Sequence, residues 1–127
     1  MKLKYLIALA TLPFISACTM ETMTTNQITE LYSDTTSLSG NKANANYYYA
    51  DGRYKSTNLE TGDVTRGTWY AKEPDEICIT SDKGESCFGM TKSDTMVTFE
   101  RNGNKSSRKI SEYLSGDQTA ELLKAAK

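Results

Sequence analysis

The stretch ICITSDKGESCF, residues 77–88, places two cysteines nine positions apart around a polar tip. Apolar and polar residues alternate beside this tip, which is typical of two strands joined by a hairpin. If the turn lies at Asp82-Lys83, Cys78 lies directly opposite Cys87, within the reach of a disulfide. Two thiols at this spacing could instead hold a metal or act as a redox pair. The cellular compartment decides among these three.

The first residues of the chain predict export. Two lysines, Lys2 and Lys4, precede a short apolar run at residues 5–15, and small residues follow. This order is typical of a secretory signal peptide. The run is shorter than the ~20 apolar residues that a membrane-spanning helix requires, so we expect no permanent transmembrane helix. We expect residues 1–17 to be a cleaved signal peptide.

The end of this segment, Ile15-Ser16-Ala17-Cys18, resembles the lipobox of bacterial lipoproteins. The resemblance implies that the Cys18 thiol receives a diacylglycerol and that cleavage leaves it as the acylated first residue. Thr19 rather than aspartate follows, which implies transfer to the outer membrane, with the domain facing the periplasm or the cell surface. Because each buried methylene contributes about 0.8 kcal/mol, several acyl chains would anchor residues 18–25, the lipidated cysteine and a polar tether. The alternative is an ordinary secretory signal with a cysteine there by chance.

Export answers the question about the two remaining cysteines. An oxidising compartment, and the use of Cys18 for lipid, leave Cys78 and Cys87 to pair with each other. A zinc site requires about four ligands, and the chain contains no histidine. A redox pair more typically has two residues between its thiols. We therefore predict a structural disulfide, with no metal and no cofactor.

Length and charge limit what the exported chain can be. Residues 26–127 have room for one domain with one core, which the disulfide would staple. The full chain has a formal net charge of −1, and loss of Lys2 and Lys4 makes it more acidic. This balance excludes the basic surface that nucleic-acid binding requires. The eight tyrosines and the plentiful Asn, Ser and Thr favour β-structure.

Turn signals recur at strand-length intervals through the middle of the chain. They are Asp51-Gly52, Thr61-Gly62-Asp63, Glu73-Pro74-Asp75, Asp82-Lys83-Gly84 and Asn102-Gly103-Asn104. This spacing predicts a mainly β fold, a small antiparallel meander that forms a barrel or curled sheet of six or seven strands. Side chains alone nearly fill a barrel of that size, so we expect no interior cavity.

Short helices are expected at both ends of the domain. Residues 24–32 have apolar residues at helical spacing, with Thr24 or Thr25 as the N-cap, and a loop follows through Ser39-Gly40-Asn41. Near the C-terminus, Ser115 or Asp117 would cap a short amphipathic helix. The segment at residues 109–113 suits either a helix or a strand.

Turn chemistry also predicts strand register. A two-residue turn at Asp51-Gly52 pairs Tyr49 with Tyr54, and one at Asn102-Gly103 pairs Glu100 with Lys105. Alternation then assigns six residues to the core, with the disulfide on the opposite face of its hairpin. These are Ile77, Ile79, Phe88, Met90, Val97 and Phe99.

The β-region is similar to an uncharacterised family of small secreted proteobacterial domains. In that family an aspartate-glycine turn precedes a Gly-x-Trp strand and two cysteines about nine apart. The matching residues are Asp51-Gly52, Gly67-Thr68-Trp69, Cys78 and Cys87. Because the family has no established activity, the resemblance implies a fold and a disulfide but no catalytic residue.

Catalytic patterns are sparse. Ser-His and Cys-His catalysis are excluded, because the chain has no histidine. Glu73, Asp75 and Glu76 could form a carboxylate pair or hold calcium, but they flank Pro74, which favours a solvated hairpin tip. We therefore expect no enzyme and no catalytic residue.

The run Tyr47-Tyr48-Tyr49 is the most distinctive candidate for binding. Alternation points its first and third rings to one face of a strand and its middle ring to the other. A recognition surface could combine aromatic rings with a cation. Its candidate residues are Tyr47, Tyr48, Tyr49, Arg53, Tyr54 and Trp69. The alternative is ordinary cross-strand packing, with Trp69 in the core.

Together these observations predict an outer-membrane lipoprotein with a non-catalytic domain that binds a protein or glycan of the cell envelope. Its partners would be the membrane, through the lipid anchor, and that envelope molecule, with no nucleic acid. Alternatives are a structural subunit of an envelope complex, a carrier of a small apolar ligand, or an inhibitor of a hydrolase. The last rests on analogy of fold alone.

Overall fold

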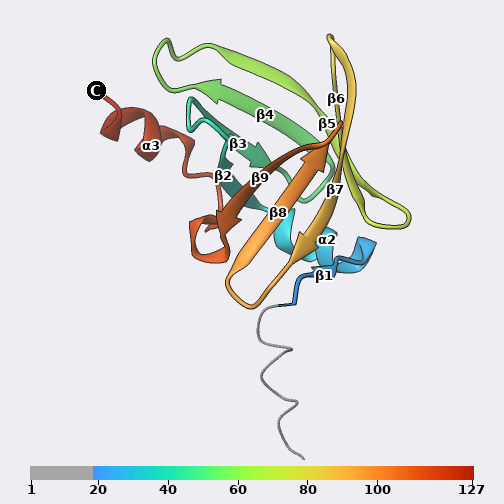
Figure 1. Cartoon of the computed structure of the whole chain (residues 1–127). Coiled ribbons are helices and arrows are strands. Elements are labelled where there is room, and N and C mark those ends of the chain that lie inside the picture. Colours follow the sequence, from blue (N-terminus) through green and yellow to red (C-terminus); the bar gives the residue numbers. More distant parts are fainter. Residues whose placement is uncertain (1–18) are drawn as a thin grey trace, which may run out of the picture.

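One long antiparallel sheet dominates the structure, a computed structural model that describes residues 19–127. Its main path runs β10-β2-β3-β4-β5-β6-β7-β8-β9 and curls into a half-barrel (Figure 1). The predicted signal peptide and Cys18 lie outside the described residues. The predicted fold class, mainly β with a curled sheet and short terminal helices, is confirmed.

The strands and helices follow one another with short connections. The strands are β1 (Glu21–Thr22), β2 (Thr35–Leu38), β3 (Asn44–Tyr48), β4 (Arg53–Asn58), β5 (Val64–Lys72), β6 (Glu76–Ser81), β7 (Gly84–Lys92), β8 (Met96–Arg101), β9 (Asn104–Lys109) and β10 (Leu114–Ser115). The helices are α2 (Thr25–Tyr32), the 3-10 turn η1 (Ile110–Glu112) and α3 (Thr119–Ala125). In the described part of the chain, no helix is both long and apolar enough to span a membrane.

Helix α2 covers one end of the half-barrel and contributes to its core. Tyr32 packs its ring edge-on against Tyr48, with centroids 4.6 Å apart, and against Tyr113 at 5.4 Å. Of the six predicted core residues, three are buried in the core cluster and the other three pack against it, as expected. The core cluster consists of Met23, Ile28, Tyr32, Tyr48, Tyr54, Trp69, Ile77, Met90 and Val97.

Two of the predicted hairpin registers are confirmed. Asn102 and Gly103 have φ values of 54° and 82°, the left-handed pair that a type I′ turn requires, and Glu100 lies opposite Lys105. In the hairpin of β6 and β7, Cys78 lies opposite Cys87 and the two are joined in a disulfide.

The predicted register at Asp51-Gly52 is wrong by one residue, because Tyr48 rather than Tyr49 lies opposite Tyr54. Gly52 has a φ of 96°, but Asp51 does not adopt a left-handed φ, so the turn is not type I′. Instead the Gly52 N–H donates to the Tyr49 carbonyl at 3.1 Å, which makes a three-residue loop. Asp51 Oδ1 accepts from the Arg53 N–H at 3.1 Å, and this side-chain bond favours the longer loop.

The sheet has more strands than the six or seven expected. Strand β2 lies between the predicted helix and the loop at Ser39-Gly40-Asn41, where the sequence predicts no strand. Thr36 in β2 is fully buried, and its hydroxyl donates to the Gly116 carbonyl at 2.7 Å and accepts from the Gln118 N–H at 2.9 Å. Both partners come from the C-terminal segment, about 80 positions away, so the residues around Thr36 give no signal that it is buried.

Part of the predicted tether belongs to the domain. Strand β1 pairs with β7, with Glu21 opposite Lys92. Met23 is buried, and its N–H donates to the Met90 carbonyl at 3.0 Å. Of the predicted tether, the segment 21–23 therefore belongs to the folded domain.

The predicted helix caps have mixed outcomes. Thr24 caps α2 as expected, and its hydroxyl accepts from the Gln27 N–H at 3.2 Å. The Ser115 cap is wrong, because this residue belongs to β10 and pairs with Thr35 of β2. Asp117 Oδ1 accepts from the Thr119 N–H at 3.0 Å, immediately before α3. The ambiguous segment at residues 109–113 contains the turn η1.

Candidate functional site

The concave side of the half-barrel contains a pocket of about 250 Å³. Its walls come from α2, from strands at both ends of the sheet path and from the segment after β9. It is lined by Tyr32, Ser37, Leu38, Ser39, Gly40, Asn46, Tyr48, Tyr54, Ile77, Ile79, Phe88, Phe99, Ser106 and Tyr113. The expectation of an interior filled by side chains is therefore wrong, since the longer path of strands leaves a hollow.

Side-chain alternation explains the character of these walls. On β6 to β8, the inward positions that face the pocket are apolar, namely Ile77, Ile79, Phe88 and Phe99. On β2, β3 and β9, the inward positions at the same level are short and polar, such as Ser37 and Ser106. The pocket is thus apolar on one side and has hydroxyl and amide groups on the other, as ligand sites commonly do.

The tyrosine hydroxyls around the pocket remain neutral at physiological pH. Burial raises the pKa of Tyr32 and of Tyr48 well above the ordinary value of 10.0. The Tyr32 and Tyr113 hydroxyl oxygens lie 3.1 Å apart and share a hydrogen bond. Each of these hydroxyls can therefore donate and accept hydrogen bonds, but none supplies a charge.

A second hollow of about 210 Å³ continues the pocket toward the turn between β8 and β9. The two hollows share Phe88, Phe99 and Ser106. The second one adds Arg101, Asn102 and Asn104 to the lining. Together they approach the few hundred cubic ångströms typical of small-molecule sites.

The pocket lies beside a seam between β9, one edge strand of the sheet, and the end of β2 that β10 does not cover. In the described residues no backbone ladder joins β9 to β2. Side chains join them instead: Arg108 donates from Nε to the Leu38 carbonyl at 3.2 Å and from Nη2 to the Ser39 carbonyl. Gly40 packs against β9, since a Cβ there would lie 3.2 Å from the Ser106 hydroxyl. Arg108 therefore holds the pocket wall together.

The six residues of the predicted aromatic surface do not share one face. Tyr48, Tyr54 and Trp69 lie in the core cluster, so for them the packing alternative holds. Tyr47 and Tyr49 lie on the outer face with their ring centroids 4.6 Å apart, as alternation predicts. Of the three inward residues, Tyr48 and Tyr54 line the pocket.

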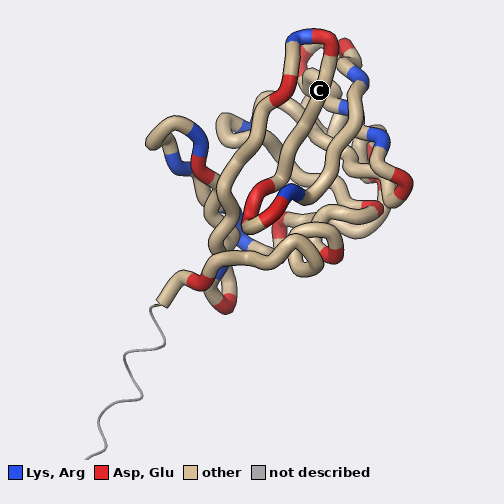
Figure 2. Tube along the Cα trace, turned by 90° about the vertical axis from the view of Figure 1, so that its right-hand side faces the viewer, with Lys and Arg blue, Asp and Glu red and all other residues tan. Residues whose placement is uncertain are grey.

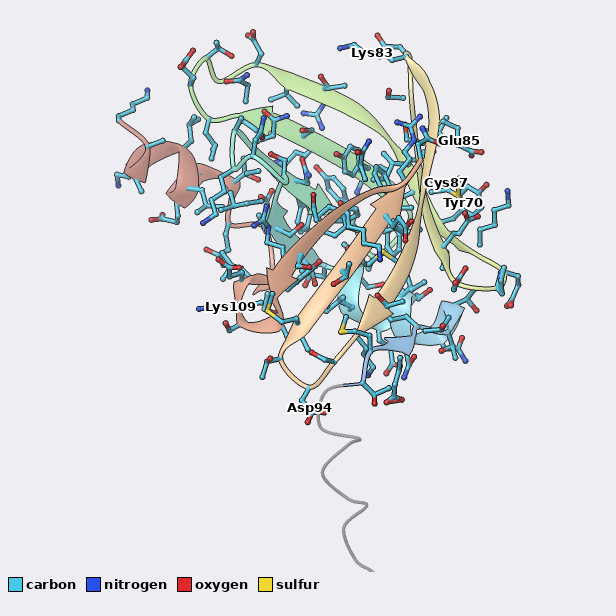
Figure 3. The ribbon with its side chains drawn as sticks, in the orientation of Figure 1. Tyr70, Lys83, Glu85, Cys87, Asp94 and Lys109 are labelled. Carbon is cyan, nitrogen blue, oxygen red and sulfur yellow. A yellow bond between two sulfur atoms is a disulfide. The ribbon has the colours of Figure 1, made fainter. Side chains whose placement is uncertain are left out.

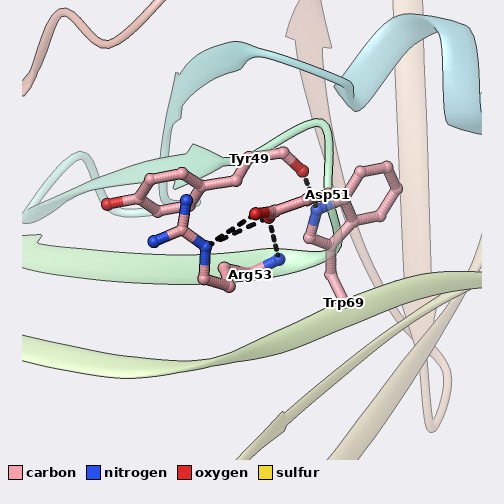
Figure 4. Close-up of polar contacts among 4 residues, drawn as sticks. All are labelled: Tyr49, Asp51, Arg53 and Trp69. Atoms are coloured by element: carbon pink, nitrogen blue, oxygen red, sulfur yellow. Dashed lines mark hydrogen bonds and ion pairs between the residues drawn. The ribbon is translucent and has the colours of Figure 1, made fainter.

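The outer aromatic residues are held by their neighbours (Figure 4). The Arg53 guanidinium carbon lies 4.1 Å from the centre of the Tyr49 ring, and its Nε lies 2.9 Å from Asp51 Oδ2. The Trp69 Nε1–H donates to the Tyr49 carbonyl at 2.8 Å, which joins the outer loop to the core. Hydrogen bonding from the Arg53 backbone N–H is the main cause that lowers the pKa of Asp51.

The neighbouring Tyr47 is also engaged. Its hydroxyl donates to Asp34 Oδ1, and this bond is the main cause that raises the pKa of Tyr47 to about 12. Lys55 Nζ lies 2.7 Å from Asp117 Oδ2. Partial burial acts to raise the pKa of Asp117, but hydrogen bonds from Lys55 and Thr119 outweigh it, so this pKa lies below its ordinary value.

The disulfide lies on the outer face of β6 and β7, near Tyr70 and Glu85 (Figure 3). The Tyr70 hydroxyl and the Thr80 hydroxyl both donate to Glu85 Oε2 at 3.1 Å. Among the described residues, the one group of three potential metal ligands within 4.8 Å of one another is Glu76 with the two cysteine sulfurs. Sulfurs joined to each other are not thiolates, so this group is not a metal site in the oxidised protein.

The predicted acidic cluster does not converge on a site. Glu73 turns toward α2, where its Oε1 accepts from the Thr25 hydroxyl at 3.0 Å. Its neighbours Asp75 and Glu76 bracket the start of β6. Figure 2 shows that acidic and basic residues gather mainly at turns rather than along the strands.

Sequence reasoning missed the seam residues that line the pocket, including Ser37, Gly40 and Tyr113. Alternation along residues 104–109 signals that Ser106 shares a face with Phe99, which lies opposite it. The sequence holds no signal that residues 37–40 meet this strand.

No protein-family model, curated protein or solved structure matches the chain.

Proposed function

We propose that the protein is a non-catalytic binding module and that its concave pocket holds a small, largely apolar ligand. The observation that carries this proposal is the pocket of about 250 Å³ with aromatic and aliphatic walls and a few hydroxyl groups. A carrier of a small apolar ligand thereby becomes the first candidate rather than an alternative.

We propose further that the module acts at the outer membrane, held there by lipid on Cys18. Support comes from the lysines, the apolar run and the lipobox-like sequence Ile15-Ser16-Ala17-Cys18. The Cys18→Ser variant is then expected in the soluble periplasmic fraction after cell fractionation. Retention of the variant with the membranes would contradict the anchor.

Ligand binding is tested with the neutral fluorescent probe N-phenyl-naphthylamine and the mature chain carrying Cys18→Ser, which avoids detergent. The probe should bind with saturation. Ser106→Trp places a large ring where both hollows meet and should weaken probe binding at least about tenfold, because it removes the volume the probe fills. The matched control is Ser107→Trp, the next residue of β9, which is exposed on the other face.

Equal probe affinity in the two tryptophan variants would place the probe elsewhere and contradict the proposed pocket. Circular dichroism and thermal melting of both variants separate loss of the pocket from loss of the fold.

A second candidate function is binding of an envelope protein or glycan at the outer loop. One observation favours it: the Arg53 side chain is 64% exposed while it stacks on Tyr49. Crosslinking in intact cells should then recover a stoichiometric partner that is lost on changing Tyr49 and Arg53 to Ala. Recovery that these changes do not affect would reject this surface.

A further inference from the structure

Two arginines occupy the inner face of the hairpin of β8 and β9. The register places Arg101 opposite Asn104 and Arg108 opposite Val97, with Phe99 between them on the same face. Val97 belongs to the core and Phe99 lines the pocket, so this face is the concave one. Both cations therefore lie on the side of the sheet that surrounds the hollow.

Arg108 is a buried cation with neutral partners. It is 6% exposed, and its guanidinium donates to the carbonyl oxygens of Leu38 and Ser39, both of which line the pocket. Within residues 19–127 no carboxylate lies within ion-pair distance of it. A guanidinium keeps its charge in proteins, and a charge in a low-dielectric interior is screened weakly. This wall of the pocket consequently has a positive potential.

Arg101 adds a second positive charge at the outer hollow. It lines that hollow with Asn104 and Ser106 and, like Arg108, forms no ion pair within the described part of the chain. Glu100, the adjacent acid, lies on the opposite face by alternation.

The charge of the site is the reverse of the charge of the chain. The residues that line the two hollows include no aspartate or glutamate in the described structure, although the chain has 16 acidic and 15 basic side chains. An aromatic pocket with only positive charge at its rim is complementary to a ligand with an apolar body and an anionic head.

We propose that the pocket selects anionic amphiphiles, which carry a carboxylate or sulfonate on an apolar body. The body lies among Phe88, Phe99 and Ile79. The head lies at the outer hollow, where Arg101 supplies the charge and Asn104 and Ser106 supply hydrogen-bond donors. This inference rests on the proposed function, since it names the class of ligand for the same pocket.

Two dyes with the same ring systems test the charge selection directly. N-phenyl-naphthylamine is neutral, and anilinonaphthalene sulfonate adds one sulfonate to the same body. On the mature chain carrying Cys18→Ser, the sulfonate should bind about tenfold more tightly at low salt, and added salt should reduce that advantage while leaving the neutral dye unchanged.

A single charge change should separate the two dyes. Arg101→Gln should weaken sulfonate binding about tenfold and change neutral-dye binding less than about twofold, because only the anion loses a charged partner. Lys105→Gln is the control, since this residue lies on the same hairpin and faces Glu100 on the outer side. It should change neither affinity. Decanoate should displace the neutral dye at lower concentration than decanol, which has the same chain length and no charge.

The outcomes distinguish this inference from the proposed function. If both dyes bind equally and Arg101→Gln affects them alike, charge selection is overturned while an apolar pocket stands. If neither dye binds, the pocket itself fails as a ligand site, and both proposals are overturned.

Discussion

At the scale of single residues, Gly67 explains the Gly-x-Trp pattern. It lies opposite Ser81, and a Cβ at this position would collide with the Thr80 carbonyl oxygen. A backbone atom of a paired strand cannot move aside as the end of a side chain can. The glycine thus permits β5 and β6 to approach closely just before Trp69 enters the core.

Gly67→Ala should lower the free energy of unfolding by about 1–3 kcal/mol, because the added methyl group forces the strands apart. Urea denaturation measures the change. Gly89→Ala is the matched control: nothing lies within 4 Å of the added Cβ, so its effect should be neutral or stabilising by up to about 1 kcal/mol. Equal destabilisation by both changes would contradict the collision.

At the scale of elements, the disulfide staples the hairpin of β6 and β7. Cys78 is fully buried and the bonded residues are separated by nine positions. The crosslink acts mainly by limiting the unfolded chain, and a loop of this size contributes about 2–3 kcal/mol. Reduction should therefore lower the thermal midpoint by several degrees. The control variant Cys78→Ala/Cys87→Ala should melt at the same temperature with or without reductant. An unchanged thermal midpoint on reduction of the native protein would contradict a stabilising role for the disulfide.

The seam between β9 and β2 is a second contact between elements that stabilises the fold. Arg108→Met should cost about 1–3 kcal/mol, since the Leu38 and Ser39 carbonyls lose their donors. Amide hydrogen exchange should accelerate in β2 and β9 and remain slow in β6. Lys109→Met, at an exposed position beside it, should leave exchange unchanged. Uniform acceleration through the sheet would show that Arg108 stabilises the whole fold rather than the seam.

At the scale of the whole molecule, the raised pKa values of several tyrosines predict loss of stability at alkaline pH. Burial raises the pKa of Tyr32, Tyr48 and Tyr113 above 10.0, and the bond to Asp34 raises that of Tyr47 to about 12. The folded state therefore holds protons that the unfolded chain releases near pH 10. This contribution is complete below about pH 10 and disappears as the pH rises through the folded pKa values.

Urea midpoints should accordingly fall steeply above about pH 10, and Tyr47→Phe should reduce the part of that fall between about pH 10 and 12. The ultraviolet absorbance of tyrosinate follows ionisation in the same samples. Tyrosines that all ionise near pH 10 while the protein stays folded would contradict the assignment.

The sequence by itself determined what depends on neighbours in the chain. Alternation assigned the core face of β6 to β8, the turn at Asn102-Gly103 fixed its register, and Thr24 capped α2. These features depend on local backbone preferences and on side-chain period, both of which a short window of sequence contains.

Only the tertiary structure decided the features that require distant partners. Thr36 became a buried strand residue because residues near 116 bond to it, and Arg108 closed the seam through a carbonyl 70 positions away. The pocket lies where β9 meets the end of β2 through the Arg108 side chain rather than through a backbone ladder. No local sequence pattern predicts this contact between β9 and β2, because the residues that stabilise it are brought together only by folding.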